Sequence, residues 1–376
     1  MKPSMRLAIA LVSTSVLWAP SVWFSGIAGA QGPHQDHGSS SINTAISPQE
    51  IAVGIAHGTT LAAAVFLVGL VAFVALVWLP ANQTENADQG KTVSLLCRWM
   101  WVLVGLLTVA GLVELPLYAV RASGETLSLG LLEEALFDTR VGQLWVVRLA
   151  LGILTATAAT YAAQQPRRLA YWWWGAAVAV GASLLMTLTQ QSHAAAEGGF
   201  LPLAADWLHL MAASLWMGGL LGFPILLLGP LRATPIEPRL KLLGRLVPRF
   251  SKVATTAVMG LILTGLVAVL LHVPSLSALI STPYGRALSI KLWLLIFLLA
   301  LGAQNLRLRG REPFNSLVRY ELALAAAIFV ATGFLTSLPP ADAEQSTVEE
   351  NIPNPAEDIR QPPVPDVQSP TAQPKG

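Results

Sequence analysis

Charged residues are scarce in this chain. Only 12% of its 376 residues are Asp, Glu, Lys or Arg, whereas soluble globular domains carry roughly 25%. Hydrophobic residues make up 54% and lie in long runs, each sufficient to cross a bilayer core of about 30 Å at 1.5 Å per helical residue. This composition excludes an ordinary water-soluble fold and predicts an all-α, polytopic transmembrane helical bundle.

Cysteine and the common catalytic motifs are also lacking. Cys97 stands alone, which excludes a disulfide framework and any CxxC metal or redox pair. The sequence has no GxxxxGK[ST] phosphate loop and no GxGxxG, and it has no GxSxG elbow or HExxH pair. We therefore expect no ATP-driven pumping by this chain alone, no enzymatic activity and no nucleic-acid partner.

The two ends differ in composition from the rest. Residues 1–30 begin with Lys2 and Arg6, continue with an apolar stretch and close on the small-x-small pattern before Gln31, which predicts a cleaved signal peptide. An uncleaved first helix is the alternative. Residues 31–50 would form a short periplasmic arm. Residues 339–376 are acidic and rich in proline, a composition that cannot bury a core and predicts a disordered periplasmic tail.

Eight apolar segments lie between these ends, and prolines sit at or just beyond several of their boundaries. The first four belong to residues 51–190 and the last four to residues 191–338. The predicted helices span residues 51–80, 97–120, 143–163, 170–190, 203–230, 253–273, 287–306 and 319–338.

Basic residues predict the orientation, because Lys and Arg in short loops are retained on the cytoplasmic side. They concentrate in the connections that follow the first, third, fifth and seventh segments. These are Lys91, Arg98, Arg167, Arg168, Arg232, Arg239, Lys241, Arg245, Arg249, Lys252, Arg307, Arg309, Arg311 and Arg319. Both termini are therefore predicted outside the cytoplasm.

All six histidines fall in the outer half on this topology. They are His34 and His37 in the arm, His57 and His209 inside the first and fifth helices, His193 after the fourth, and His272 at the end of the sixth. An imidazole within a membrane helix usually faces the bundle interior and marks a ligand site or an ion path, although it can also serve as a hydrogen-bonded link between helices. The gathering of all six on one side favours ligand binding.

Acidic and sulfur-containing residues accompany these histidines. Asp206 lies one turn before His209 and could fix its tautomer, as the outer hydrogen-bond partner of a metal-binding histidine does. Met186 shares a predicted face with His193, and thioether with imidazole suits copper. Glu114 is a further buried acid of the second helix.

A short repeat links the two halves. Thr139-x-x-Gly142 is followed by Arg148, and Thr282-x-x-Gly285 is followed by Lys291 at the same spacing. The match fits a duplicated four-helix bundle, and it is short enough to arise by chance.

The second half resembles the CopD family of copper-resistance membrane proteins. The resemblance is carried by Gln191-Ser192-His193-Ala194, Ala205-Asp206-Trp207-Leu208-His209, Trp216-Met217-Gly218-Gly219-Leu220-Leu221, Arg249-Phe250-Ser251, Thr264-Gly265, the segment 282–292, Asn305, Glu321 and Pro339-Pro340. It implies a multi-pass protein of the bacterial inner membrane that handles copper on its periplasmic side, with a periplasmic CopC-like protein as a possible partner. The predicted arm is too short to contain such a domain.

Together, these observations predict a copper-handling inner-membrane protein that binds copper at its outer face and moves it into or across the membrane. The alternative is a membrane redox protein with b-type haem, since His57 and His209 could supply two axial ligands. The candidate copper ligands and their supports are His209, His193, His57, Asp206, Met186, His272, Glu114, His34 and His37.

Overall fold

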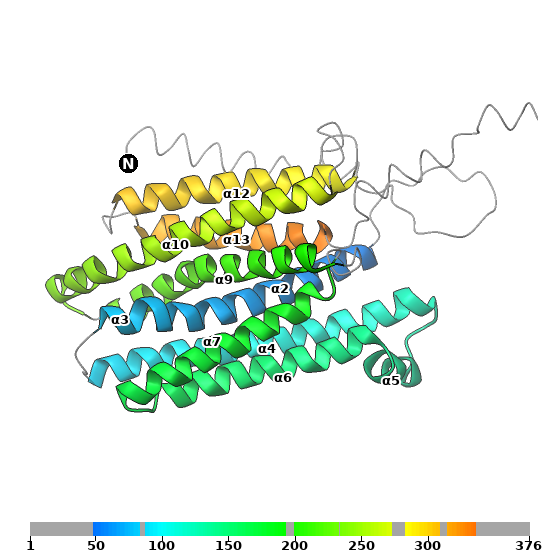
Figure 1. The fold of residues 1–376 in the computed structure, drawn as a ribbon, viewed down its shortest axis with the longest axis horizontal. Helices are drawn as coiled ribbons and strands as arrows, with labels where there is room; N and C mark the ends of the chain where they lie inside the picture. The colour runs from blue at the N-terminus through cyan, green and yellow to red at the C-terminus, as the bar shows by residue number, and fades with distance from the viewer. Residues whose placement is uncertain are drawn as a thin grey trace, which may run out of the picture.

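The computed structural model is a bundle of long helices that run roughly along one axis (Figure 1). It describes residues 48–82, 87–192, 199–232, 234–272, 283–308 and 314–335. Within these ranges every regular element is a helix, as the composition predicts. The signal peptide, nearly all of the arm and the tail from residue 339 lie outside the described residues, so those three predictions stay untested.

The elements follow one another with short connections. They are α2 (Pro48–Phe73), the π-helix η2 (Val74–Trp78), α3 (Leu79–Ala81), α4 (Ala87–Ser123), α5 (Leu129–Phe137), α6 (Arg140–Ala162), α7 (Arg167–Thr189), α9 (Phe200–Leu228), the short 3-10 helix η3 (Pro230–Arg232), α10 (Ile236–His272), α12 (Pro283–Leu308) and α13 (Phe314–Leu335).

Each of the eight predicted segments coincides with one long helical stretch, α2, η2 and α3 forming a single continuous one. Seven described stretches are long and apolar enough to cross a membrane, and α13 contributes a shorter apolar part, Tyr320–Leu335. The polytopic helical prediction is therefore confirmed. The π-helical turn of η2 lies next to Pro80, whose ring lacks an N–H and disturbs the regular hydrogen-bond ladder.

Two helical regions were not predicted. The helix α5 is only nine residues long, and it is capped by Ser128, whose side chain accepts a hydrogen bond from the Leu131 N–H. The first part of α10 precedes the apolar run and contains five basic residues between residues 236 and 252. Neither region has the length of uninterrupted apolar sequence that identified the others.

The centre of the bundle is the crossing of α2 and α9, two helices that run in the same direction (Figure 1). Gly69 and Gly218 meet there so closely that a Cβ built on Gly218 would lie 2.0 Å from the Gly69 carbonyl oxygen. A Cβ on Gly69 would lie 2.3 Å from the carbonyl oxygen of Ser214. Only glycine permits this backbone contact.

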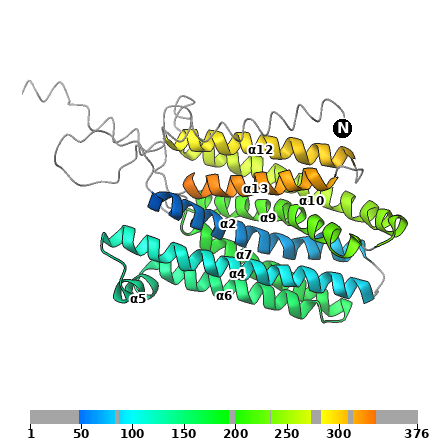
Figure 2. The same ribbon diagram turned by 180° about the vertical axis from the view of Figure 1, so that it is seen from behind.

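The remaining helices flank this central pair on opposite sides. The helices α4, α6 and α7 lie beyond α2, whereas α10 and α12 lie beyond α9, as both views show (Figures 1 and 2). The helix α13 packs against α2 as well as α12, and a Cβ on Gly333 would lie 2.2 Å from the Gly54 carbonyl oxygen. The chain thus forms two four-helix halves joined through α2 and α9.

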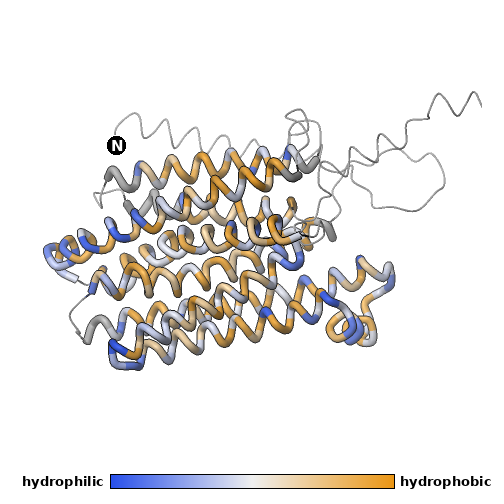
Figure 3. Tube along the Cα trace, viewed as in Figure 1, coloured by the Kyte–Doolittle hydropathy of each residue, from blue (hydrophilic) through white to orange (hydrophobic). Residues whose placement is uncertain are grey.

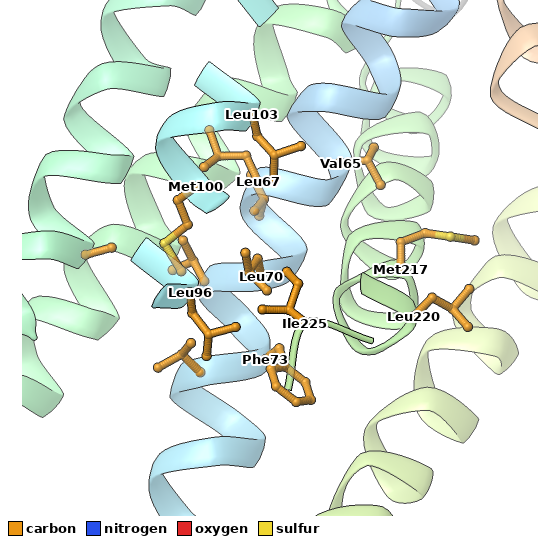
Figure 4. Packing of buried hydrophobic residues seen from close by; sticks show 14 of the residues in the cluster. Val65, Leu67, Leu70, Phe73, Leu96, Met100, Leu103, Met217, Leu220 and Ile225 are labelled. Carbon is orange, nitrogen blue, oxygen red and sulfur yellow. The ribbon is translucent and has the colours of Figure 1, made fainter. Parts of the chain in front are cut away.

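Apolar side chains fill the space around the crossing. Close-packed apolar side chains of α2, α4 and α9 fill this region, and Phe73 lies at its lower edge, below Leu70 and Ile225 (Figure 4). The Phe73 ring lies edge-on to Phe223, with 5.4 Å between ring centroids, and Phe250 of α10 joins the pair at 5.3 Å from Phe223. The thiol of Cys97 is buried in the same cluster, with its Sγ 3.8 Å from the Ala159 carbonyl oxygen.

Basic connections gather at one end of the bundle. Hydrophobic residues run along most of each long helix, while polar ones mark the start of α10 and the turn between α6 and α7 (Figure 3). These basic connections lie at one end of the bundle, and the start of α2 and the start of α9 lie at the other (Figure 1). The predicted histidine end is therefore opposite the basic end.

Candidate functional site

A histidine and a glutamate meet across two helices of the first half. Nδ1 of His57 in α2 lies 2.6 Å from Oε1 of Glu114 in α4. The two side chains are 18% and 17% exposed. The hydroxyl of Thr60, one turn along α2, donates to Glu114 Oε2 at 2.7 Å. Both carboxylate oxygens are therefore engaged by α2.

A buried arginine of the first half, Arg148 in α6, is held by α7. Arg148 is 2% exposed, and its Nε and Nη2 donate to the hydroxyl and carbonyl oxygens of Thr187 in α7 at 3.2 and 3.3 Å. A further hydrogen bond joins it to Gln191 Oε1. The guanidinium is therefore held by α7.

The second half places His209 of α9 in a comparable setting. Its Nδ1 lies 2.9 Å from Oγ1 of Thr264 in α10. Thr264 donates its single hydroxyl hydrogen to a backbone carbonyl of its own helix, that of Gly260 at 2.7 Å. Its oxygen must then accept from the imidazole.

The hydrogen-bond network assigns the same tautomer to both histidines. An ionised carboxylate only accepts, so His57 Nδ1 carries the hydrogen in its bond to Glu114, and His209 Nδ1 carries it in its bond to Thr264. A neutral imidazole with hydrogen on Nδ1 has its lone pair on Nε2. Nε2 is the nitrogen that such an arrangement presents to a metal ion.

An acid and a base accompany His209 as well. Asp206, one turn earlier in α9, is within electrostatic range of Lys291 in α12, and Lys291 is also within range of His209. The sequence interpretation assigned Asp206 to the tautomer of His209. The structure gives His209 Nδ1 a partner on a different helix, Thr264, and the proposed contact between Asp206 and His209 stays a prediction.

The two histidines occupy related positions. His57 precedes Gly69 by twelve residues and His209 precedes Gly218 by nine, so they lie about 18 Å and about 14 Å along their helices from the α2–α9 crossing, on the same side of it. Arg148 and Lys291 come from the third helix of each half, at the spacing of the short repeat. The arrangement is that of a parallel duplication.

The capping threonine of the repeat also has a visible role. Thr139 precedes α6, and its hydroxyl oxygen accepts from the Gly142 N–H at 3.1 Å. A Cβ on Gly142 would lie 2.1 Å from the Ala135 carbonyl oxygen, so glycine lets α6 pack on the end of α5. Thr282 of the second copy lies outside the described residues.

Other predicted ligands are placed only in part. Met186 is half-buried on α7. His272 is the last residue of α10, and its side chain lies outside the described part. His34, His37 and His193 also fall outside. Among the described residues no three His, Cys, Asp or Glu side chains come together as a metal-binding group.

Sequence reasoning missed the groups that hold the histidines. Thr60 and Thr264 were not considered as partners, because a threonine in an apolar helix carries no distinguishing pattern. Arg148 and Lys291 were noted as members of the short repeat, without a predicted role in the site. The repeat in which they stand was the signal that could have identified them.

The fold and these sites define a class: a polytopic helical membrane protein of two halves, each with an oriented histidine, an acid and a base toward one end. Residues 49–203 match the family model described as copper resistance protein D-like, N-terminal domain, and residues 244–335 match that of copper resistance protein D. The chain therefore belongs to the copper resistance protein D family, which confirms the resemblance inferred from its sequence.

Two curated relatives carry names that fit this family. The chain is 29% identical over 262 residues to the copper transport protein CutJ of Bacillus subtilis (strain 168), covering 67% of this chain and 48% of that protein. It is 26% identical over 208 residues to copper resistance protein D of Pseudomonas syringae pv. tomato, covering 54% and 65%. The chain thus spans less than two thirds of either relative.

No solved structure matches this chain. Both relatives are named for copper transport or resistance. The names refer to no enzymatic reaction, and they give no support to the haem alternative.

Proposed function

We propose that this protein receives copper at the histidine end of the bundle and moves it into or across the membrane. His57 and His209 are the first ligands, each through Nε2, and Glu114 orients His57. Copper is the transported substrate rather than a resident cofactor. His193, His272, Met186, His34 and His37 are further ligands that would complete the coordination from the same end.

The observation that carries this proposal is the 2.6 Å contact between His57 and Glu114 inside an apolar bundle. Ionisable groups in membrane helices are costly to bury and are retained mainly where they bind or conduct an ion. A carboxylate that accepts from Nδ1 raises the basicity of the imidazole and fixes the direction of Nε2. The pair is therefore suited to hold a transition metal.

Family membership selects copper among the metals that imidazole binds. Neutral imidazole suits zinc, copper, iron and nickel alike, so the geometry alone leaves the metal open. The names of both relatives refer to copper. The proposal takes the ligand type from the structure and the identity of the ion from the family.

The distribution of basic residues supports a periplasmic location for the histidine end. The basic start of α10 lies at the opposite end of the bundle, and such segments are retained in the cytoplasm. The protein would then be a multi-pass protein of the bacterial inner membrane. A separate CopC-like periplasmic protein is the expected donor or acceptor of the copper.

Copper binding by purified full-length protein tests the ligand assignment. In a His209→Ala background, His57→Ala should lower the copper affinity at least tenfold, because it removes the imidazole and leaves Glu114 without its main partner. Thr59→Ala in the same background is the matched control, since its hydroxyl donates to the Ile55 carbonyl oxygen of its own helix. Equal affinities of the double variant and of His209→Ala alone would reject the proposal.

Reporter fusions test the sidedness separately. An enzyme that is active only outside the cytoplasm should be active when fused after Pro340 and inactive when inserted after Arg232. The reverse pattern would place the histidine end in the cytoplasm. It would make a cytoplasmic carrier of reduced copper the expected partner.

A further inference from the structure

The interface of α9 and α10 carries the histidine of the second half at one level and a cluster of rings at another. At the histidine end, Nδ1 of His209 lies 2.9 Å from Oγ1 of Thr264. Phe223 follows His209 by fourteen residues on α9, and Phe250 precedes Thr264 by fourteen residues on α10. Both rings therefore lie about 21 Å further toward the basic end. One pair of helices joins the histidine to the ring cluster.

The ring cluster consists of three phenylalanines in mutual contact. Ring centroids are 5.4 Å apart between Phe73 and Phe223, 5.3 Å apart between Phe223 and Phe250, and 6.4 Å apart between Phe73 and Phe250. A Cβ on Gly219 would lie 1.9 Å from the Phe250 ring, and one on Gly222 would lie 2.6 Å from the Phe73 ring. The rings thus pack directly on the α9 backbone. Such an apolar constriction offers no ligand to an ion and blocks its passage.

The helix α10 is held chiefly by α9. On the face that the two helices share, a Cβ on Gly260 would lie 3.4 Å from the Ala212 Cβ, so small groups meet there. Met259, Ile262 and Leu263 of α10 are each more than half exposed. The helix α2, by contrast, packs against α4, α9 and α13. A helix with few neighbours and a smooth packing face can slide along its partner in a shear movement.

The third ring stands beside an irregular turn of α2. Phe73 directly precedes the π-helical turn η2, and the start of α10 packs against η2 and α3. Single π-helical turns are frequent at functional sites, because they interrupt the regular hydrogen-bond ladder. The helix α10 therefore contacts both the ring cluster and the turn next to it.

We infer that α10 slides along α9 during transport, and that Phe73, Phe223 and Phe250 form the seal that this movement opens toward the basic end. The inference rests on the proposed function, because it concerns the passage of copper from the histidine end. The helix that carries Phe250 also carries Thr264, so one movement parts the rings and withdraws the partner of His209. An imidazole without its Nδ1 partner binds a metal less firmly. Opening of the seal and release of copper are thereby coupled.

A cross-link between α9 and α10 tests the movement. Ala212→Cys combined with Gly260→Cys places two sulfurs on Cβ atoms 3.4 Å apart, close to the roughly 3.5–4.5 Å of a disulfide. After treatment with a thiol oxidant, the double variant in proteoliposomes should carry copper about tenfold more slowly than either single variant treated alike, because the rings stay closed. Its copper affinity should stay within about twofold of theirs, because His209 keeps its partner. Unchanged flux in the cross-linked protein would overturn the movement of α10.

Removal of a ring tests the seal in the same assay. Phe250→Ala should raise copper flux about tenfold, and it should restore flux to the cross-linked protein, because an open seal makes the movement unnecessary. Phe329→Ala is the matched control, since its ring pairs with Phe66 between α13 and α2, with 5.6 Å between centroids. Phe250→Leu gives a second measurement should Phe250→Ala not fold, and its flux should lie between those of Phe250→Ala and the wild type. Wild-type flux in the folded Phe250 variants would overturn the seal.

The wild type separates this inference from the proposed function. Absence of both copper binding and copper flux would overturn the proposed function, and the seal with it. Binding without flux would overturn the movement of copper across the membrane and the seal. Binding and flux that neither the cross-link nor the ring substitutions alter would overturn the sliding of α10 and the seal, while the proposed function stands.

Discussion

The two halves of the bundle hold a histidine in the same way but balance its charge differently. In the first half the Nδ1 partner of His57 is the carboxylate of Glu114. In the second half the partner of His209 is the hydroxyl of Thr264, and the acid, Asp206, lies on the same helix as the histidine. The helix positions correspond, whereas the chemical groups at those positions do not.

This difference separates what the fold determines from what the side chains determine. The orientation of each imidazole requires only an acceptor on the second helix of its half, and a carboxylate or a hydroxyl can supply it. The charge near the imidazole depends on which acceptor is used. In the first half one residue, Glu114, both orients the imidazole and carries a charge, whereas in the second half the orienting residue, Thr264, is uncharged.

The comparison of the two halves assumes that the close contact between α2 and α9 is needed for a stable fold. Gly218→Leu should destabilise the protein by about 3 kcal/mol or more, because any Cβ would overlap the Gly69 carbonyl oxygen. Yield after detergent extraction and a thermal melt would measure this. Gly105→Leu is the control, since among the described residues no atom outside its own turn of helix lies within 4 Å of a Cβ built there. A Gly218→Leu protein that melts like the wild type would refute the contact.

Removing a histidine from a helix should affect copper binding more than removing one from the N-terminal arm. His209→Ala should lower copper binding at least tenfold, whereas His34→Ala should change it less than about twofold. An imidazole held between helices is already ordered, while the arm must be ordered on binding at an entropic cost. Titration of the purified variants with copper would show the difference. Equal small effects would argue against a site on α9.

Removal of each Nδ1 partner sharpens the comparison between the halves. Glu114→Gln should weaken the first site by roughly 10-fold to 100-fold, the usual cost of losing a carboxylate behind a metal-binding histidine. Thr264→Val should weaken the second site by less than about tenfold, because it removes a neutral hydrogen bond. Each variant is measured with the other histidine changed to alanine. Equal losses would mean that the charge of Glu114 is irrelevant.

Glycines of the second helix in each half test how tightly the halves are packed. Gly111→Ala should cost about 1 to 3 kcal/mol, because its Cβ would collide with the indole of Trp145. Gly260→Ala should cost less than about 1 kcal/mol, since the nearest atom would be the Ala212 Cβ at 3.4 Å. Thermal melts of both variants give the comparison. A larger loss for Gly260→Ala would reverse the expected order.

The helices were largely predictable from the sequence because a membrane-spanning segment can be identified by its length and its apolar composition. The same criterion misses α5, whose nine residues include Glu133 and Glu134, and the basic first part of α10. Both lie where the chain leaves the apolar core. Their helical form depends on capping by Ser128 or on packing, for which a hydropathy pattern has no signal.

The residue types of the site were predictable, but their partners were not. His57 and Glu114 stand 57 residues apart, and no spacing rule says that they meet. Helical spacing suggested Asp206 for His209 because it considers one helix at a time, whereas Thr264 comes from another. Arg148 sits near a helix end in the sequence, yet it is 2% exposed because α7 covers it.

The burial of Cys97 makes the protein suited to labelling at cysteines introduced elsewhere. It is the single cysteine of the sequence, and its sulfur lies between helices in the described core. A water-soluble maleimide should therefore leave the native protein unmodified. New cysteines introduced one at a time along α2 and α9 would report which positions face water, and protection of those positions by copper would trace the path of the ion.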